Sequence, residues 1–467
     1  MTGAGAVRQG MSMDMDVNIL AVLAERMDTM EIKGVSIDSR TIGKGELFIA
    51  IRGDRFDGHD FVEEVLRKGA CGALVERSAL ETGHPGLGGR PDIYPVEDTL
   101  RSLQELSLMH RNRFTIPLVA VTGSNGKTTT KEMLAAILLH QGPVLKNEGN
   151  LNNHIGVPLT LLKLGPAHRA AVIELGMSNF GEIELLTRLA RPDVGVITNI
   201  GPAHLEFLKS TDGVARAKGE LLETMRSDGT AVLNADDQYF DALRTRFRGR
   251  TISFGIDRPA DVRASDLRQT VAGTEFALHA GGRSFPVRLA AAGRHNVSNA
   301  LAAAAAAVAL GMTPETVQAG LEKFRPVTMR SEVREVRGIS VIADCYNANP
   351  ASMAAAITLL ASLRRQGGLA IAVLGDMLEL GEGGAAAHQA VGGAAAAAGL
   401  DLLIVLGAQQ QQVFGGARSG GMAADRMLPA DSAERAAALL RERARPGDTV
   451  LIKGSRGMKM EKVLEAF

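Results

Sequence analysis

Apolar and polar positions follow two different periods along the 467-residue chain. Short apolar runs bounded by glycine, proline or aspartate are typical of buried strands, and apolar residues three and four positions apart are typical of helices. Segments of the two kinds follow each other along most of the chain. This pattern predicts an α/β fold whose sheets are mostly parallel and covered by helices on both faces.

The N-terminal part has the weakest pattern. Residues 1–15 show no regular period and are predicted to be irregular and mobile, whereas residues 17–26 predict a short amphipathic helix. The next segment predicts a small α/β unit, with strands at 35–38, 47–51 and 72–76 and helices at 59–69 and 98–112.

Beyond residue 117 the alternation is clearer. Strands are predicted at 117–122, 170–174, 193–199, 230–234 and 251–254, and helices at 127–140, 181–190, 211–225, 236–247, 296–310 and 313–324. Residues 261–290 alternate with a period of two, and Gly281-Gly282 predicts a hairpin turn between two strands. The C-terminal part predicts strands near 332–336, 339–344, 369–374, 401–406 and 448–452.

Breaks in this pattern at 113–117 and 323–328 divide the chain into three domains, the number that its length favours. We expect a small N-terminal α/β domain at 1–115, a central, mostly parallel α/β domain at 116–326, and a C-terminal Rossmann-like α/β domain at 327–467.

Charge and cysteine content exclude several classes of function. Lysine plus arginine and aspartate plus glutamate both number 52, so net charge gives no reason to expect a nucleic-acid or anionic membrane partner. Two cysteines argue against a disulfide scaffold and fit a reducing compartment. The N-terminus has no apolar leader, and no apolar run is long enough to span a membrane, so we expect a cytoplasmic protein without membrane insertion.

The clearest chemical signal is VTGSNGKTTT, residues 121–130, which joins a predicted strand to a predicted helix. Its glycines let backbone N–H groups turn toward a phosphate, the helix N-terminus carries partial positive charge, and the lysine reaches the terminal phosphates. The Thr128 hydroxyl is placed to hold Mg²⁺. The alternative is an ordinary strand-to-helix turn, because Val121 stands where the general phosphate-loop pattern has glycine.

The sequence TGSNGKTT resembles the phosphate loop of the Mur ligase family and of its relative folylpolyglutamate synthase. The resemblance implies ATP-dependent amide bond formation with ATP and Mg²⁺ as cofactors. It assigns UDP binding to the N-terminal domain and ATP binding to the central one. It also implies that Lys127 is catalytic and that ATP is bound by Gly123, Ser124, Asn125, Gly126, Lys127, Thr128 and Thr129.

Two N-terminal segments resemble the UDP-binding domain of the same family. Asp38-Ser39-Arg40 taken alone is a solvated turn. The resemblance implies instead that this turn and the later Gly53–His59 segment face the uridine diphosphate, through Ser39, Arg40, Asp57 and His59. An arginine suits a diphosphate because its guanidinium offers a planar fork of donors.

The stretch KNEGNLNNHIGVP, residues 146–158, holds four asparagines in a glycine-bearing loop. Asparagines often serve turns, which is the alternative here. We expect Asn150, Asn152 and Asn153 to contact substrate oxygens. The stretch most closely resembles that of the family members that add D-alanyl-D-alanine.

Three further residues are candidates for metal binding and catalysis. Glu174 ends an apolar strand, where α/β sheets gather ligands and where a carboxylate suits Mg²⁺; the alternative is a solvated strand-end acid. His204 and Lys218 taken alone indicate a structural histidine and a surface lysine. The resemblance implies that His204 helps to hold a second Mg²⁺ and that Lys218 is carbamylated and so becomes a magnesium ligand.

The segments near the C-terminus complete the predicted site. Asn296 and Asn299 lie on one helical face, either near the adenine, as the resemblance implies, or with Asn296 as an N-cap. The resemblance places Arg330 at the ATP phosphates, Asp344 at the ribose, and Asn347 and Asn349 toward an incoming dipeptide. LGDMLELG (374–381) and LIKGSRGMKME (451–461) also resemble the family, with glycine turns as the alternative.

The resemblance extends from Val35 to Met460 and implies three small-molecule substrates: ATP, a UDP-linked muramoyl tripeptide and D-alanyl-D-alanine. We expect a monomer without a nucleic-acid partner. The rival functions are the neighbouring ligase that adds the third amino acid, folylpolyglutamate synthase, and an ATP-binding scaffold without catalysis.

Overall fold

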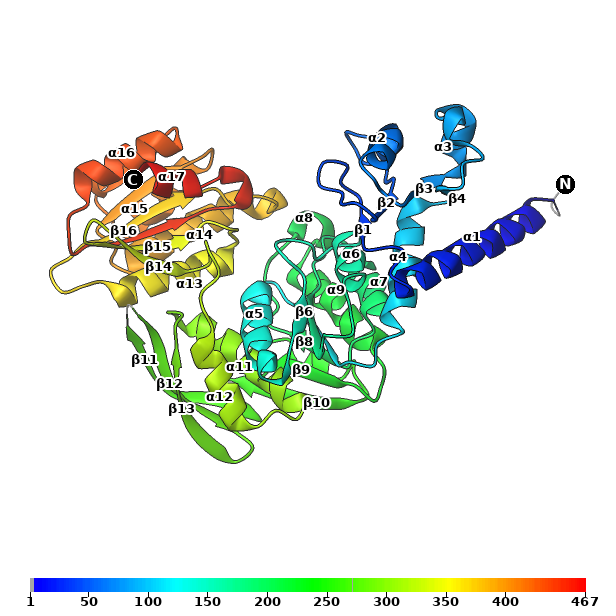
Figure 1. Cartoon of the computed structure of the whole chain (residues 1–467). Helices are drawn as coiled ribbons and strands as arrows, with labels where there is room; N and C mark the ends of the chain where they lie inside the picture. The colour runs from blue at the N-terminus through cyan, green and yellow to red at the C-terminus, as the bar shows by residue number, and fades with distance from the viewer. Residues whose placement is uncertain (1–3, 271) are drawn as a thin grey trace. The chain divides into compact units, whose positions relative to one another are not determined.

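The computed structural model describes residues 4–270 and 272–467 and confirms the predicted α/β architecture with three domains. Figure 1 labels its helices and strands along the chain. By compactness the chain forms two units. Of the described residues, the first unit comprises 4–118, 143–176 and 185–191, and the second comprises 119–142, 177–184, 192–270 and 272–467.

The first unit contains a four-stranded parallel sheet in the order β1-β2-β3-β4. All four strands are short, which fits the loop-rich sequence around them. The elements are β1 (Val35–Ser36), β2 (Leu47–Ile49), β3 (Gly72–Glu76), β4 (Ile93–Val96), α2 (Val62–Arg67), α3 (Arg77–Thr82) and α4 (Thr99–Arg111). The same unit holds β6 (Val144–Lys146), which pairs in parallel with β7 (Ala170–Glu174), and α6 (Gly156–Leu161).

The N-terminal helix is longer than predicted. α1 (Ala4–Asp28) includes most of the stretch 1–15 for which irregular structure is predicted, so that prediction is wrong from Ala4 onward. Residues 1–3 lie outside the described residues. The stretch has no proline and contains alanine, methionine, glutamine and arginine, which favour a helix. It lacks an apolar period, and therefore its pattern does not reveal the helix.

The first compact unit extends beyond the predicted boundary at residue 115. Leu162 belongs to the same apolar core as Leu20 and Leu106. Arg111 donates from Nε to the carbonyl of Ala190 over 3.0 Å. This buried cross-connection explains why 143–176 and 185–191 group with the N-terminal residues rather than with the rest of the central segment.

The second unit contains a larger, mostly parallel sheet. β5 (Leu118–Thr122), β8 (Val194–Ile197), β9 (Thr230–Asn234), β10 (Arg250–Gly255) and β11 (Val262–Thr270) pair successively in parallel, and β12 (Gly273–Ala280) and β13 (Arg283–Leu289) continue it antiparallel. Gly281 and Gly282 both have positive φ, as a tight hairpin turn requires, and this confirms the predicted hairpin.

The helices of the second unit follow the prediction closely, apart from α10, which is shorter than predicted, and α8, which was not predicted. They are α5 (Lys127–Leu138), α8 (Leu205–Leu208), α9 (Thr211–Thr224), α10 (Phe240–Arg244), α11 (Arg294–Ala309) and α12 (Pro314–Lys323). The predicted helix at 181–190 is α7 (Glu182–Ala190), most of which belongs to the first unit. α10 covers less than the predicted 236–247, because Asn234 and Asp237 accept backbone hydrogen bonds and form turns first.

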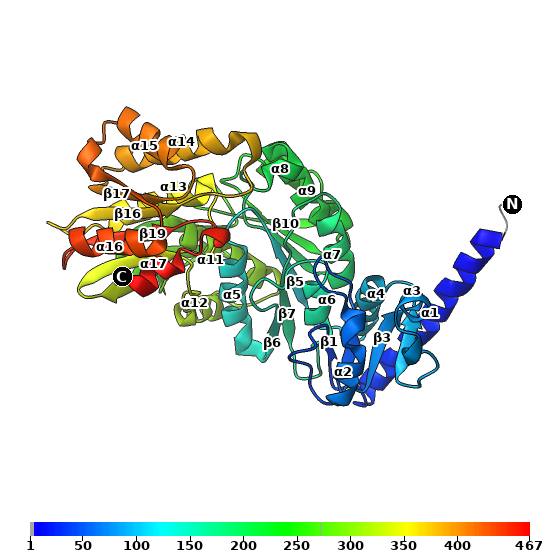
Figure 2. The same cartoon turned by 90° about the horizontal axis from the view of Figure 1, so that it is seen from above.

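The C-terminal part of the second unit has a six-stranded sheet in the order β14-β15-β19-β16-β17-β18, with helices on both faces (Figure 2). One apolar core lies under α13, α14 and α15, and another under α16 and α17. The strands are β14 (Glu332–Val336), β15 (Ile339–Asp344), β16 (Ala370–Gly375), β17 (Leu402–Leu406), β18 (Met427–Ala430) and β19 (Thr449–Lys453). The helices are α13 (Pro350–Leu363), α14 (Gly384–Ala397), α15 (Gln410–Ser419), α16 (Ala433–Arg443) and α17 (Glu461–Ala466).

Three short strands escape prediction from the sequence: β4, β6 and β18. β4 and β18 each contain a proline, which cannot donate to a ladder and lowers the expectation of a strand. β6 is only three residues long. Pairing with neighbouring strands, rather than local pattern, therefore determines these elements.

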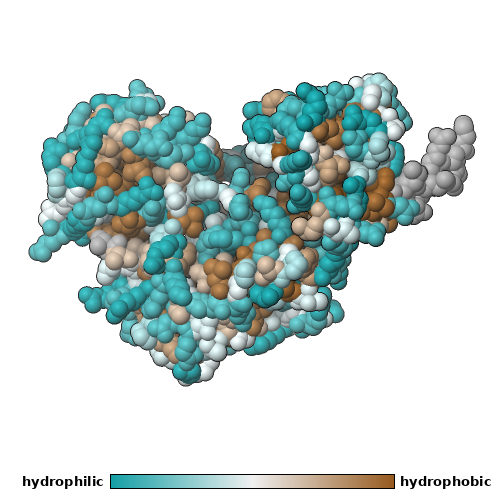
Figure 3. All heavy atoms as spheres, viewed as in Figure 1, coloured by the Kyte–Doolittle hydropathy of each residue, from teal (hydrophilic) through white to brown (hydrophobic). Residues whose placement is uncertain are grey.

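The visible surface is mostly hydrophilic, and apolar residues appear on it in separate groups (Figure 3). In the described ranges, no helix combines the length and apolar character needed to cross a membrane.

Helices α14 and α15 touch through glycines, which yields a stability prediction. A Cβ on Gly416 would lie 1.8 Å from the carbonyl oxygen of Gln389, whereas a Cβ on Gly415 meets nothing within 4 Å. We expect Gly416→Ala to destabilise the protein by about 2 kcal/mol through overpacking. Gly415→Ala should be neutral or stabilising by about 0.5 kcal/mol, since alanine favours a helix. Thermal and urea unfolding of both variants measure this; equal stability of the two would contradict the close helix contact.

Candidate active site

The phosphate loop connects β5 to α5, and two of its glycines cannot be replaced without a clash. Gly123 has a φ of +148°, and a Cβ there would lie 1.9 Å from Oγ1 of Thr198. Gly126 has a φ of +81°, and its Cβ would lie 2.0 Å from Oδ1 of Asn299. Both the backbone conformation and the surrounding side chains therefore require glycine.

Two side chains at the end of β8 hold this loop. Asn199 accepts a hydrogen bond from the N–H of Asn125 at Oδ1 (3.0 Å) and donates from Nδ2 to its carbonyl (3.1 Å). Thr198 donates from Oγ1 to the same carbonyl over 2.5 Å. The N–H of Ser124 donates to the carbonyl of Asn199 (2.9 Å). Thr198 and Asn199 are not among the predicted site residues, although their position directly after an apolar strand is the signal that could have revealed them.

Lys127 and Thr128 begin α5, directly after the loop. Lys127 donates from Nζ to the carbonyl of Gly123 over 2.9 Å, so its ammonium lies across the loop. Thr128 and Thr129 are buried in the first helical turn. A glycine loop, a helix N-terminus and an ammonium group together form an anion-binding site suited to a polyphosphate.

The charge of Lys127 acts on two other predicted site residues, Lys218 of α9 and His204. Lys218 is fully buried, and burial, together with the charge of Lys127, lowers its pKa well below the usual value. Burial also lowers the pKa of His204, the charges of Lys218 and Lys127 lower it further, and Glu379 opposes them. The structure therefore brings these three predicted residues together and favours an uncharged amine at Lys218.

His204 contacts a residue of the LGDMLELG segment. Its Nδ1 lies 3.1 Å from Oε2 of Glu379. Both residues have positive φ, +53° and +62°, which is uncommon for residues other than glycine. Such backbone strain concentrates at functional sites. A carboxylate on Nδ1 orients an imidazole and leaves Nε2 to face a ligand.

In the first unit, Glu174 lies at the carboxyl end of β7 and is almost fully buried, which rejects the alternative of a solvated acid. Asn152 donates from Nδ2 to Oε1 of Glu174 (2.8 Å). Asn147 binds the backbone of Glu174 with both ends of its amide. Its Oδ1 accepts from the N–H and its Nδ2 donates to the carbonyl, both over 2.9 Å. Asn147 is a residue that sequence reasoning did not select, although it opens the same asparagine-rich loop.

The other two asparagines of this loop differ from Asn152. Asn150 is exposed. Asn153 accepts at Oδ1 from the N–H groups of Ile155 (3.2 Å) and Gly156 (2.9 Å), so its side chain shapes the turn before α6. The turn role considered in the sequence analysis thus applies to Asn153.

The first unit has a cavity of about 1040 Å³ that Ser39 and Arg40 line. The hydrogen-bonded Arg40 guanidinium lowers the pKa of Asp38 to about 2, so the Asp38 carboxylate stays ionised and holds the arginine. The remaining lining comes from β1, β2 and the residues beside them, from the segment 53–61, and from α6 and its flanks: Val35, Ser36, Ile37, Asp38, Phe48, Ile51, Gly53, Asp54, Arg55, Phe56, Gly58, Phe61, Leu151, Ile155, Leu159 and Lys163.

Asp57 and His59 support this cavity rather than line it. The His59 ring is fully buried; Nδ1 lies 2.5 Å from Oδ1 of Asp57, and Nε2 accepts from the N–H of Glu76 over 2.9 Å. Asp57 also accepts from Nε of Arg52 over 2.9 Å. Both side chains fix the loop that carries Gly58.

Asn296 and Asn299 lie inside α11, which begins at Arg294 with Gly293 as its N-cap. The alternative that Asn296 caps the helix is therefore wrong. Asn296 donates to the carbonyl of Ala292 (2.8 Å), and Asn299 donates to Oδ1 of Asn296 (3.2 Å). Asn299 also packs against Gly126, so this amide pair lies directly behind the phosphate loop.

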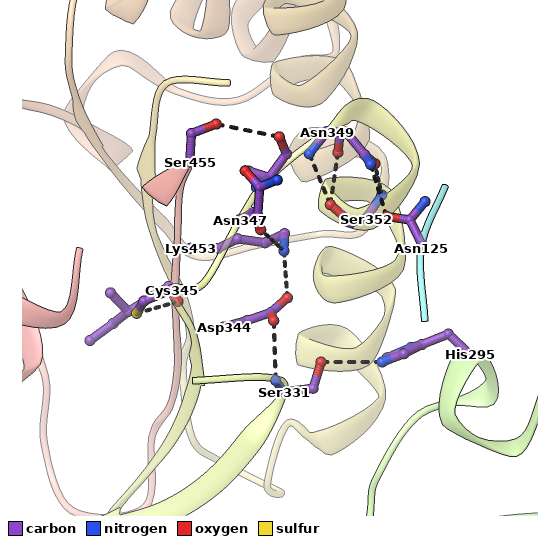
Figure 4. Close-up of polar contacts among 12 residues, drawn as sticks. Asn125, His295, Ser331, Asp344, Cys345, Asn347, Asn349, Ser352, Lys453 and Ser455 are labelled. Carbon is purple, nitrogen blue, oxygen red and sulfur yellow. Dashed lines mark hydrogen bonds and ion pairs between the residues drawn. The ribbon is translucent and has the colours of Figure 1, made fainter. Parts of the chain in front are cut away.

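In the C-terminal sheet, Asp344 ends β15 and forms a largely buried ion pair (Figure 4). Its Oδ2 lies 2.5 Å from Nζ of Lys453, and its Oδ1 accepts from the N–H of Ser331 over 3.1 Å. Lys453, at the end of β19, also donates to the carbonyl of Asn347 over 3.1 Å. Lys453 belongs to the LIKGSRGMKME segment, whose role the sequence left open.

Arg330 stacks its guanidinium on the ring of Tyr346, 3.9 Å from the centroid. This contact holds the arginine near the segment that carries Asn347 and Asn349. Asn347 is exposed, whereas Asn349 is the N-cap of α13.

Mg²⁺ prefers oxygen ligands, and each unit offers one by itself: the Thr128 hydroxyl in the second unit and the Glu174 carboxylate in the first. Over residues 4–270 and 272–467, no three histidine, cysteine, aspartate or glutamate side chains gather as a ready-made metal site. Either oxygen would therefore hold Mg²⁺ only together with further oxygens, such as those of a nucleotide, as is common for this ion.

The loop, its lysine and the helix that follows first define the class: a P-loop nucleotide-binding protein of the α/β type. Three family descriptions then match successive parts of the chain: "Mur ligase family, catalytic domain" at 31–111, "Mur ligase middle domain" at 121–307, and "Mur ligase, glutamate ligase domain" at 329–456.

Individual proteins match over nearly the whole length. The UDP-N-acetylmuramoyl-tripeptide–D-alanyl-D-alanine ligase of Bacillus subtilis is 38% identical over 435 residues, 93% of each chain. A crystal structure of MurF from Acinetobacter baumannii superposes with a TM-score of 0.84 at 34% identity, covering 93% of each chain. MurF ligase from Thermotoga maritima in complex with ADP superposes at 0.82 with 30% identity, covering 94% of this chain and 98% of that one. The chain belongs to the Mur ligase family and is an ATP-dependent ligase.

The Asp344–Lys453 pair leads to a prediction. Lys453→Met would leave the largely buried Asp344 carboxylate without its cation, and we expect a loss of about 3 kcal/mol in the free energy of unfolding. Lys462→Met, on the exposed side of α17, should change it by less than about 0.5 kcal/mol. Urea unfolding compares the two. If both variants unfold like the wild type, the pair does not stabilise the C-terminal sheet.

Proposed function

We propose that the chain joins D-alanyl-D-alanine to the terminal carboxylate of UDP-N-acetylmuramoyl-tripeptide and forms ADP and phosphate. This is a step of peptidoglycan synthesis. The observation that carries the proposal is the phosphate loop held by Thr198 and Asn199, within a chain that matches relatives of that name over 93% of its length.

Each domain has its own substrate in this proposal. Residues 1–115 bind the UDP-linked peptide, with Ser39 and Arg40 facing the diphosphate in the cavity and with Asp57 and His59 supporting it. Residues 116–326 bind ATP. Residues 327–467 contact the dipeptide and the nucleotide, with Asp344 at the ribose and Arg330 at the phosphates.

The reaction passes through an acyl phosphate. The tripeptide carboxylate attacks the terminal phosphorus of ATP, and ADP leaves. Lys127 neutralises charge on the transferred phosphoryl group as it moves. The amine of D-alanyl-D-alanine then attacks the acyl carbon, and the tetrahedral intermediate expels phosphate. Asn150, Asn152 and Asn347 orient the peptide oxygens.

Magnesium would neutralise the phosphate oxygens during this transfer. We assign it to Thr128 and Glu174, whose oxygens fit the ion, with His204 and Lys218 near a second ion. An uncharged, buried lysine is the form that reacts with carbon dioxide, and the resulting carbamate offers the oxygens that an amine lacks.

We place the reaction in the cytoplasm, where ATP is available, and expect a monomer. Both cysteines, Cys71 and Cys345, are free thiols, which fits a reducing compartment.

Phosphate release tests the proposal. With ATP, Mg²⁺ and UDP-N-acetylmuramoyl-tripeptide, phosphate should appear with D-alanyl-D-alanine and fall at least about a hundredfold with single amino acids, because the site is built for a dipeptide. EDTA should stop release, and added Mg²⁺ should restore it. Release with a single amino acid or with glutamate on a folate, but not with the dipeptide, would favour a rival ligase. Full turnover in EDTA would reject the magnesium assignment.

A further inference from the structure

Asn347 and Asn349 lie two residues apart in the segment before α13, but their amides have different surroundings (Figure 4). Asn347 is exposed; its Oδ1 accepts from the N–H of Ala348 (2.9 Å), and no described residue accepts a hydrogen bond from its Nδ2. Asn349 uses both ends of its amide. Its Oδ1 accepts from the N–H of Ser352 (2.9 Å), and its Nδ2 donates to Oδ1 of Asn125 over 2.8 Å.

Asn125 is the central residue of the phosphate loop. Its backbone N–H and carbonyl are already bound by Thr198 and Asn199. The side-chain oxygen is therefore the group that Asn125 offers to the C-terminal domain. The Nδ2 group of Asn349 donates to this oxygen, while its Oδ1 caps α13. One amide therefore links the start of α13 to the phosphate loop.

The other end of the same segment also has a link to the central domain. Asp344 accepts from the N–H of Ser331, and Oγ of Ser331 lies 3.2 Å from Nε2 of His295 in α11. Lys453 fixes the middle of the segment by binding both Asp344 and the carbonyl of Asn347. The segment is thus held at both ends against elements that surround the phosphate loop, and Asn347 projects from it.

We propose that Asn349 is a positioning residue, which aligns residues 344–349 with the phosphate loop through Asn125, whereas Asn347, which the proposed function already places at the dipeptide, has no such link among the described residues. This assignment rests on the proposed function. It separates two residues to which the resemblance gives the same role.

A double-mutant cycle tests the contact. Asn349→Ser keeps a good N-cap but removes the amide donor. A neutral hydrogen bond lost at this place should lower kcat/KM for D-alanyl-D-alanine on the order of fivefold to tenfold. Combined with Asn125→Ala, the double variant should be no worse than the more severe single one, because both remove the same contact. The losses in kcat/KM caused by Asn347→Ala and Asn125→Ala should instead multiply in their double variant. Asn347→Ala should act mainly on KM for the dipeptide.

Ser352→Ala is the matched control, because it removes the reciprocal capping bond and leaves the Asn125 contact intact. It should stay within about twofold of wild-type kcat/KM. The proposal would be overturned if the losses in kcat/KM of Asn125→Ala and Asn349→Ser multiplied in the double variant. It would also be overturned if Asn125→Ala were coupled to Asn347→Ala instead.

Hydrogen exchange gives a readout independent of turnover. ADP should slow amide exchange in the first turns of α13 in the wild type and in Ser352→Ala, but not in Asn349→Ser, while protection of α5 persists in all three. Equal protection of α13 in Asn349→Ser would overturn the positioning role. If the wild type releases no phosphate with the dipeptide, the proposed function fails, and the exchange experiment still decides whether Asn349 links the loop to α13.

Discussion

The side chains of Thr198 and Asn199 fix the backbone of the phosphate loop at Asn125, and the rest of the site depends on this interaction. A loop that binds a triphosphate must present its N–H groups in one conformation, because reorganisation during phosphoryl transfer would weaken the stabilisation of charge. Gly123 and Gly126 make that conformation accessible, and the neighbouring strand end keeps it. Lys127 then lies across the loop, where the transferred group would be.

The same arrangement recurs at other strand ends. Glu174 ends β7, Asp344 ends β15 and Lys453 ends β19, which agrees with the general tendency of α/β sheets to bind ligands at the carboxyl ends of strands. Each of these charged groups is largely buried, and each has a specific partner that offsets part of the cost of burial. In each unit, therefore, the fold already holds these polar groups in place before a substrate arrives.

Much of this site could be predicted from the sequence, because a glycine loop between strand and helix and a charged residue after an apolar run are local patterns. The contacts between distant segments could not be predicted. The proline and serine that follow Asn349 mark it as a helix N-cap, but only the folded chain shows that its amide also binds Asn125 whereas Asn347 faces solvent. Likewise, α1 has helix propensity without an apolar period, and the pairing of Lys453 with Asp344 joins residues 109 positions apart.

The central claim is that this loop binds the triphosphate of ATP and that Lys127 acts on it. The most direct test is phosphate release by Lys127→Ala with ATP, Mg²⁺, UDP-N-acetylmuramoyl-tripeptide and D-alanyl-D-alanine, together with thermal unfolding to show that the variant is folded. We predict a loss of about a hundredfold or more in kcat/KM with little change in stability, since Lys127 lies at the polyphosphate site rather than in a core. Turnover equal to that of the wild type would contradict the account.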